Sequence, residues 1–199
     1  MADLLFFNRW SADGVAVADP GLIKYMNIAP KMMPKTGARY AGNRFHKSQT
    51  FIVERLASKL MGSGHKSKKH FMSSGHNTGK KSKVLKVVEN ALAKAEQKLK
   101  ENPLKILVKA IENAAPREEV IAIEYGGARY PKAVDVAPQR RIDLALRYMT
   151  QGAYTRSFNK KMSIENALAE EIIAAYQLSA KSNAVAKKRD LERQASSSK

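Results

Sequence analysis

One block of positive charge constrains this chain more than any other feature. Between Lys24 and Val88 there are 15 basic residues and a single acidic residue, Glu54. Ordinary solvated surfaces mix both signs of charge, whereas single-sign blocks are typical of partner-binding surfaces or of disordered arms. Because like charges in one compact body repel each other, the block favours a protein that works with a polyanion or with counterions nearby.

The composition of the whole chain supports the same interpretation. Its 199 residues include 36 Lys and Arg against 18 Asp and Glu, which gives a net charge of +18. Hydrophobic residues make up 44% of the chain, which is enough for the core of a single domain. A nucleic acid is the first candidate for the polyanion, and an anionic membrane surface is the second.

Several classes of protein are disfavoured by what the sequence lacks. The chain has no cysteine, which excludes disulfides, thiolate zinc sites and cysteine nucleophiles. No apolar run reaches the 18 residues that a membrane span needs, and no basic segment precedes an apolar stretch at the start of the chain. We therefore expect a cytoplasmic protein with no membrane partner.

Residues 1–47 are predicted to form an irregular basic arm. Pro20, Pro30 and Pro34 and several glycines interrupt any long helix. The arm also carries aromatic residues that need a surface to pack on, either the body of the protein or a partner. These aromatic residues are Phe6, Phe7, Trp10, Tyr25, Tyr40 and Phe45.

Residues 48–180 are predicted to form a helical body. Apolar residues recur three and four positions apart, which is the period of an amphipathic helix. The predicted helices span about 50–62, 83–101 and 103–115, then a fourth from Pro138 to Gly152 and a fifth from Ser163. The tail 181–199 is predicted to contain a short basic helix before a disordered end.

A two-stranded hairpin is predicted at 119–136. Two runs of alternating residues flank Gly126 and Gly127, and such a turn can need a positive φ at both central positions. In this register Ile123 faces Tyr130, and Glu124 faces Arg129. Pro131 fits an edge strand, and because a lone hairpin is only marginally stable in water, the ribbon must lean on helices or on a partner. The predicted fold is mainly α, a single helical domain of about five to six helices with a protruding β-hairpin.

Residues 62–83 are predicted to form a mobile basic loop, because they are rich in Gly, Ser and Lys and show no period. Within it, Gly75 to Ser82 resembles a phosphate-binding loop, but the glycines are one residue too close and a lysine replaces the required Ser or Thr. His65, His70 and His76 share the loop without the acidic or thiolate ligands that a zinc site needs. We expect neither a nucleotide nor a metal there.

No catalytic cluster stands out elsewhere. Glu118 and Glu119 are adjacent, as are Glu170 and Glu171. Neighbours on a helix point about 100° apart, so a pair of this kind does not form a shared acid and base site. We interpret both pairs as ordinary surface and expect a protein that is not an enzyme and has no cofactor.

Clusters that mix basic and aromatic residues are a stronger signal. Residues 36–47 combine guanidinium groups, rings and glycines, which suit phosphate neutralisation, base stacking and close backbone approach. The alternative is an arm whose rings pack on its own body. Arg140 and Arg141 open the fourth predicted helix, where basic residues oppose the helix dipole, so an anion nearby would compensate.

Several segments resemble one family when they are taken in order. They are Ile52-Val-Glu-Arg-Leu56, Lys59-Leu-Met61, Gly79-Lys-Lys81, Asn102-Pro-Leu104, Ala110-Ile-Glu-Asn-Ala-Ala-Pro-Arg-Glu118, Tyr125-Gly-Gly127, Ala133-Val-Asp-Val-Ala-Pro-Gln-Arg-Arg-Ile-Asp-Leu-Ala-Leu-Arg147 and Asn183-Ala-Val-Ala-Lys-Lys188. The chain resembles ribosomal protein seven of the small subunit, in its archaeal and eukaryotic form. The likeness runs from about Phe6 onward, and the run 110–147 is highly specific.

The resemblance implies a helical body with a protruding hairpin and a primary binder of the ribosomal RNA that forms the head of the small subunit. It implies nucleation of head assembly, a position near the tRNA exit site and the messenger RNA path, and a C-terminal region near protein eleven of the small subunit. Two features depart from the family. The 62–83 loop is longer than expected, and Tyr154 follows Gly152 and Ala153 where the family often has an arginine.

These expectations combine into one predicted RNA-binding set. The resemblance implies contacts from Arg39, Arg44, Lys47, Lys80, Lys81, Arg117, Arg129, Arg140 and Arg141. The predicted set also includes Tyr40, Phe45, Lys83, Tyr130, Lys132, Arg147, Lys187 and Lys188. Two alternatives stay open from the residues alone: a nucleic-acid or anionic-surface binder outside the ribosome, and an RNA-processing enzyme.

Overall fold

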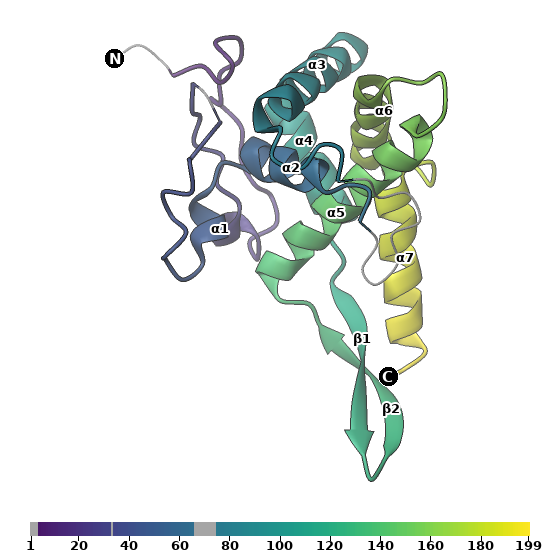
Figure 1. The fold of residues 1–199 in the computed structure, drawn as a ribbon. Coiled ribbons are helices and arrows are strands. Elements are labelled where there is room, and N and C mark those ends of the chain that lie inside the picture. Colours follow the sequence, from purple (N-terminus) through teal and green to yellow (C-terminus); the bar gives the residue numbers. More distant parts are fainter. Residues whose placement is uncertain (1–3, 33, 66–74) are drawn as a thin grey trace.

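A computed structural model describes residues 4–32, 34–65 and 75–199 of the protein. Six helices form the body, and a two-stranded ribbon extends from its lower end (Figure 1). The body helices are α2 (Ile52–Met61), α3 (Lys81–Leu99), α4 (Pro103–Ala114), α5 (Pro138–Ser157), α6 (Ile164–Tyr176) and α7 (Asn183–Ser196). The predicted fold class is therefore confirmed, and the structure adds a single helical turn, α1 (His46–Gln49), and a short 3-10 turn (Ile23–Tyr25) within the arm.

The apolar stripes of these helices meet in one core, as their period predicts. Ile52, Leu56, Leu92, Leu107 and Ile142 are fully buried in it. Helix starts follow their predicted caps: the Asn102 side chain accepts from the backbone N–H of Leu104, and the Ser163 hydroxyl accepts from that of Asn166. Local sequence thus fixes where these helices begin, and the stripes fix which faces are buried.

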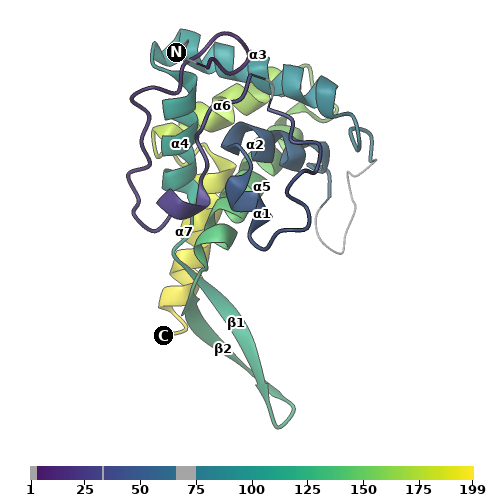
Figure 2. The ribbon, with the colours of Figure 1, turned by 90° about the vertical axis from the view of Figure 1, so that its left-hand side faces the viewer.

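The N-terminal arm lies along one side of the body and contributes to the core (Figure 2). Phe6 is fully buried against Phe51 with ring centroids 5.7 Å apart, and Trp10 is 6% exposed. The Trp10 indole N–H donates to the Glu96 carboxylate at 2.8 Å, so the arm is tied to α3. These rings therefore pack on the body, whereas Phe45 stays 57% exposed.

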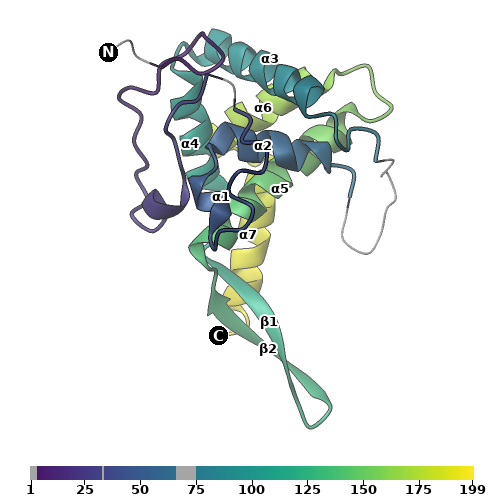
Figure 3. The same ribbon diagram turned by 60° about the vertical axis from the view of Figure 1, so that its left-hand side comes forward.

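The ribbon consists of β1 (Glu118–Tyr125) and β2 (Ala128–Asp135), which pair antiparallel. The predicted register is confirmed, since Ile123 pairs with Tyr130 and Glu124 with Arg129. Gly126 and Gly127 have φ of 58° and 81°, which is the conformation that a two-residue hairpin turn of this kind requires. The tip of the ribbon projects well away from the helices (Figure 3).

The root of the ribbon leans on α7, which runs beside it (Figures 2 and 3). The backbone N–H of Arg117 donates to the Glu192 carboxylate at 3.0 Å, and that of Ala133 donates to the Ser198 carbonyl at 3.4 Å. Lys199 pairs with Glu118 at 2.9 Å. The tail is therefore helical as predicted, but the expectation of a disordered end is wrong because the last residues contact the strands.

Helix α5 corrects the prediction that Gly152 ends it. The helix continues through Gly152 to Ser157. A Cβ atom at position 152 would lie 2.8 Å from the Asn183 Cβ and 3.0 Å from the Glu171 carboxyl carbon. Glycine is present here because α6 and the start of α7 pack close to α5, and not because the backbone turns.

Candidate nucleic-acid interface

The predicted RNA-binding residues divide into an outward group and an inward group. The outward basic residues have exposed side chains: Arg39, Arg44, Lys80, Lys83, Arg117, Arg129, Lys132, Arg147 and Lys187. The inward group contacts the protein's own acceptors: Lys47, Lys81, Arg140, Arg141 and Lys188. The difference is decided by which acidic or carbonyl groups the fold brings next to each cation.

The segment 36–47 presents rings and cations together at the surface. The Arg44 guanidinium lies 5.4 Å from the centroid of the Phe45 ring. Lys31, which is not in the predicted RNA-binding set, has its Nζ 5.1 Å from the centroid of the half-buried Tyr40 ring. A cation beside the exposed Phe45 ring offers a phosphate and a base adjacent contacts, so this segment has the chemistry expected of an RNA-binding surface.

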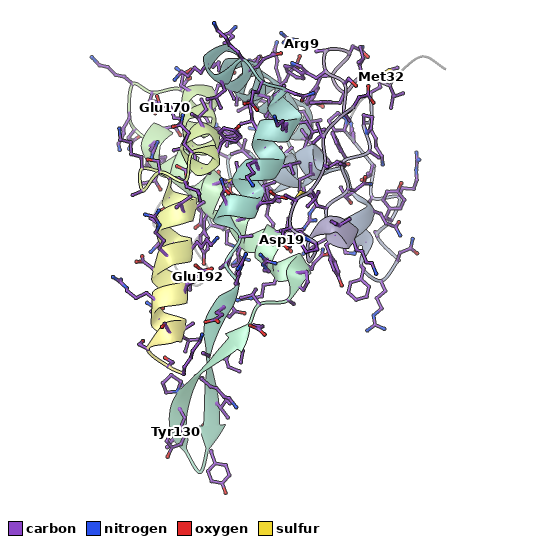
Figure 4. The ribbon with its side chains drawn as sticks, turned by 180° about the vertical axis from the view of Figure 1, so that it is seen from behind. Arg9, Asp19, Met32, Tyr130, Glu170 and Glu192 are labelled. Carbon is purple, nitrogen blue, oxygen red and sulfur yellow. The ribbon has the colours of Figure 1, made fainter. Side chains whose placement is uncertain are left out.

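The ribbon presents a second surface of the same kind. Side chains alternate across a strand, so Ile121, Ile123 and Tyr125 share one face with Tyr130 and Lys132 across the pair. All five are exposed, Tyr125 to 82% and Tyr130 to 58%, and Tyr130 lies on the ribbon beyond the end of α7 (Figure 4). The predicted RNA-binding set includes Tyr130 and Lys132 but not their β1 neighbours, although the same alternation identifies them.

The first turn of α5 has the nearby anions that the sequence predicted, and the protein itself supplies them. Arg140 donates two hydrogen bonds of 2.7 Å to the Glu119 carboxylate, and Arg141 donates one of 2.7 Å to Asp19 and one of 3.2 Å to the Pro116 carbonyl. The anions that compensate the helix dipole are thus carboxylates of the protein itself, and Asp19 lies near the root of the ribbon (Figure 4). Glu119, interpreted above as ordinary surface, is a partner in this cluster.

Burial and ion pairing also shift the pKa values of these groups. Burial alone would raise the pKa of Asp19, but the hydrogen bond from Arg141 and the nearby guanidinium charges outweigh it and lower that pKa. The hydrogen bond to Glu119 raises the pKa of Arg140. Arg141 is only 11% exposed. Replacing it would therefore disturb the fold and not only a binding surface.

The single acid of the basic block is also buried and paired. Glu54 is 1% exposed, forms an ion pair with Lys81, and accepts from the backbone N–H of Thr36 at 2.9 Å. This one carboxylate therefore ties the arm, α2 and α3 together. Lys81 is held inward, while Lys80 and Lys83 on either side of it are exposed.

A second, partly buried carboxylate collects three cations. Asp143 lies 2.9 Å from the Lys47 Nζ, 3.4 Å from the Arg55 Nη2 and 3.8 Å from the Lys59 Nζ. Burial alone would raise the pKa of Asp143, but the hydrogen bond from Lys47 and the charges of Lys59 and Arg55 lower it. Lys47 is thus a link between the arm and α5, which the sequence did not reveal.

The two lysines predicted to bind RNA in the tail also differ in whether they contact the protein itself. Lys187 is exposed, whereas the Lys188 ammonium donates to the Asn113 carbonyl at 3.0 Å, and burial lowers the pKa of Lys188. Lys188 therefore joins the start of α7 to the end of α4. Of the two lysines, only Lys187 is fully available to a partner.

Other chemistry finds little support in the described part of the chain. Within residues 4–32, 34–65 and 75–199, no group of three or more His, Asp or Glu residues is placed to hold a metal ion. The same residues include no helix with the length and hydropathy of a membrane span. Residues 76–79 form a turn just before α3. His70 and the inner part of the 62–83 loop lie outside the described residues.

Comparison with known proteins decides among the remaining classes. Residues 23–199 match the model of the family described as ribosomal protein S7p/S5e. The chain belongs to this family. It is 53% identical over 193 residues to the small ribosomal subunit protein uS7 of Nanoarchaeum equitans, covering 97% of this chain and 98% of that protein.

Two further relatives agree. The uS7 proteins of Methanothrix thermoacetophila and Archaeoglobus fulgidus are 44% and 43% identical, covering 94% and 99% of this chain and 95% and 96% of their own lengths. The resemblance drawn from the sequence is confirmed. The chain is a small-subunit ribosomal protein of a structural, non-enzymatic family that functions in translation and whose general role is ribosomal RNA binding. This membership does not favour either alternative left open by the residues.

Proposed function

We propose that this S7-family chain is a primary binder of the ribosomal RNA domain that forms the head of the small subunit, and that its binding nucleates head assembly. One observation carries the proposal. Six of the nine outward cations lie on the segment 36–47, at the start of α3 and on the ribbon, and the first and last of these places also present exposed rings. Cations and rings together suit folded RNA, in which phosphates and unstacked bases lie side by side.

The ribbon gives this proposal its second part. Its distal half is exposed on both faces, with Arg129 and Tyr130 next to the turn, whereas Lys132 lies nearer the root, beside Ser198 and Lys199. We assign the ribbon to the neighbourhood of the tRNA exit site and the messenger RNA path, as the family resemblance implies. A projecting, cation-bearing ribbon can reach RNA that the helical body does not touch.

The third part concerns the protein partner and the compartment. We assign the C-terminal region, with α7, to a position near protein eleven of the small subunit, within ribosomes of the cytoplasm. The exposed face of α7 supports this because it carries Lys187, Arg189 and Arg193 outside the core. Arg189 also donates to the Leu178 carbonyl and Arg193 pairs with Asp190, each at 3.2 Å, but both residues stay exposed.

The salt dependence of RNA binding tests the proposal. If about ten phosphates are neutralised, log K for a head-domain RNA fragment falls with log salt at a slope of roughly −7 to −9. Filter binding from low to moderate salt measures this slope. A slope shallower than about −3 would contradict phosphate-dominated recognition.

A paired set of variants sharpens the test at the ribbon. Arg129→Met with Lys132→Met removes two outward cations, so the slope is expected to become shallower by about two. Lys98→Met with Lys160→Met is the matched control, because both lysines are exposed and neither lies on the ribbon or on the segment 36–47. An equal change in both double variants would show that only net charge matters.

A further inference from the structure

An open pocket of about 630 Å³ lies between the end of α2 and the middle of α5. Lys59 and Arg147 line it from these two helices, and Ser58 and Ser63 also belong to its lining. The Gln151 side chain donates to the His65 carbonyl at 3.2 Å, which ties α5 to the chain that follows α2. Among the described residues, those that line the pocket include no acidic side chain.

Positive charges outnumber negative charges around this pocket. Asp143 is the carboxylate next to Lys59, at 3.8 Å, but it also serves Lys47 and Arg55. Burial lowers the pKa of Lys59, and although Asp143 acts in the opposite sense, the charges of Lys47, Arg147 and Arg55 lower it further. Three cations therefore share the Asp143 carboxylate, Arg147 adds a fourth positive charge near Lys59, and the pocket is where a further anion can approach Lys59 and Arg147.

We propose that this pocket binds a single phosphate group between Lys59 and Arg147, and we call this site the seat. A guanidinium binds phosphate oxygens with two parallel N–H groups, the ammonium adds a point charge, and the two serine hydroxyls can donate to the remaining oxygens. Donors that come from two helices and from the chain after α2 suit a tetrahedral anion better than a planar carboxylate. An RNA backbone and free inorganic phosphate offer the same group, and only the RNA source rests on the proposed function.

Thermal unfolding of the full chain tests the seat without RNA. Inorganic phosphate, exchanged for chloride at constant ionic strength, is expected to raise the Tm of the wild type by about 3 °C at ten times its Kd. Lys59→Met with Arg147→Met is expected to abolish this rise, while Lys98→Met with Lys160→Met retains it. Lys59→Arg keeps the charge and is expected to retain the rise, which separates loss of the seat from damage to the fold.

The salt slope with head-domain RNA tests the source. Two independent surface cations reduce the slope by about two, whereas two cations that share one phosphate reduce it by about one. A reduction of about one in Lys59→Met with Arg147→Met supports an RNA phosphate in the seat. An unchanged slope, with the thermal effect present, would overturn the RNA source and leave an adventitious ion only.

The two proposals fail in different ways. If the wild type does not bind head-domain RNA at all, the proposed function fails, and the thermal effect of inorganic phosphate still decides the seat. If phosphate raises the Tm of wild type and the Lys59 and Arg147 double variant equally, the seat is overturned even though RNA binding persists. A loss of the rise in the control double variant would overturn it too, because the effect would then follow net charge.

Discussion

Two regions of the molecule carry clusters of basic residues, and they differ in whether carboxylates of the protein contact those residues. In the inner region, around α5 and the start of α3, Lys81, Arg141 and Lys47 each contact a carboxylate of the protein. In the outer region, Arg44 and Lys132 have no ion pair among the described residues. The net charge of the chain therefore overstates the charge available to RNA, because part of it holds the arm, the helices and the ribbon together.

The largest expected effect falls on the inner region. Asp143→Asn leaves the buried Arg55 and its neighbours without a countercharge, so the free energy of unfolding at neutral pH is expected to fall by about 3–5 kcal/mol. Urea denaturation measures this change. Asp135→Asn is the control, since Asp135 is exposed on the ribbon.

The same variant makes a prediction about pH. Burial tends to raise the pKa of Asp143, but Lys47, Lys59 and Arg55 outweigh it, so the pKa lies below the ordinary 3.8. A carboxyl group of this kind stabilises the fold above its ordinary pKa, and this contribution is lost as the pH falls through the folded-state value. The wild type should therefore lose stability below about pH 4 more steeply than Asp143→Asn, and parallel profiles would contradict the assignment.

The next effect compares two lysines that lie two positions apart. Lys81→Met strands the buried Glu54 carboxylate, and the expected loss of stability is about 3 kcal/mol. Lys83→Met removes an exposed cation, so stability should change by less than about 0.5 kcal/mol while RNA affinity falls. Denaturation and filter binding on both variants separate the two roles. Equal stabilities would remove the distinction between inner and outer cations at α3.

This pair also shows what sequence can and cannot predict here. The helices and the ribbon register depend on residues three, four or two positions apart, so their pattern is visible in the chain itself. The partners of the cations are not visible, since Lys81 meets Glu54 and Arg141 meets Asp19, 27 and 122 positions away. The sequence correctly indicated that an anion should lie near the start of α5, but only the fold shows that the protein provides it.

Gly152 illustrates the same limit for packing. Glycine near the expected end of a helix is a common stop signal, and the prediction followed that rule. The structure instead uses the missing Cβ to admit Asn183 and Glu171 close to α5. Whether a glycine turns the backbone or makes room for another element depends on residues that are distant in the chain, so local patterns do not distinguish the two cases.

A smaller effect is expected where the two regions meet. Glu119→Gln weakens the ion pair that holds Arg140. The Arg140 side chain is 54% exposed and can then turn toward RNA. Since an exposed ion pair contributes at most about 1 kcal/mol, the expected gain in RNA affinity is up to about fivefold, with a similarly small loss of stability. Filter binding measures the gain, and Arg140→Met in the same background should abolish it. Unchanged affinity would remove Arg140 from the RNA-binding set.

The smallest effect belongs to the tip of the ribbon. Arg129 and Glu124 lie 3.5 Å apart, but they are 76% and 62% exposed, so water and salt screen their attraction. Glu124→Gln is therefore expected to change the free energy of unfolding by less than about 0.5 kcal/mol. RNA affinity should rise slightly because a repelling charge is gone and Arg129 has lost its partner. A loss of stability above about 1 kcal/mol would mean that the tip, like the first turn of α5, uses its cations to hold the fold.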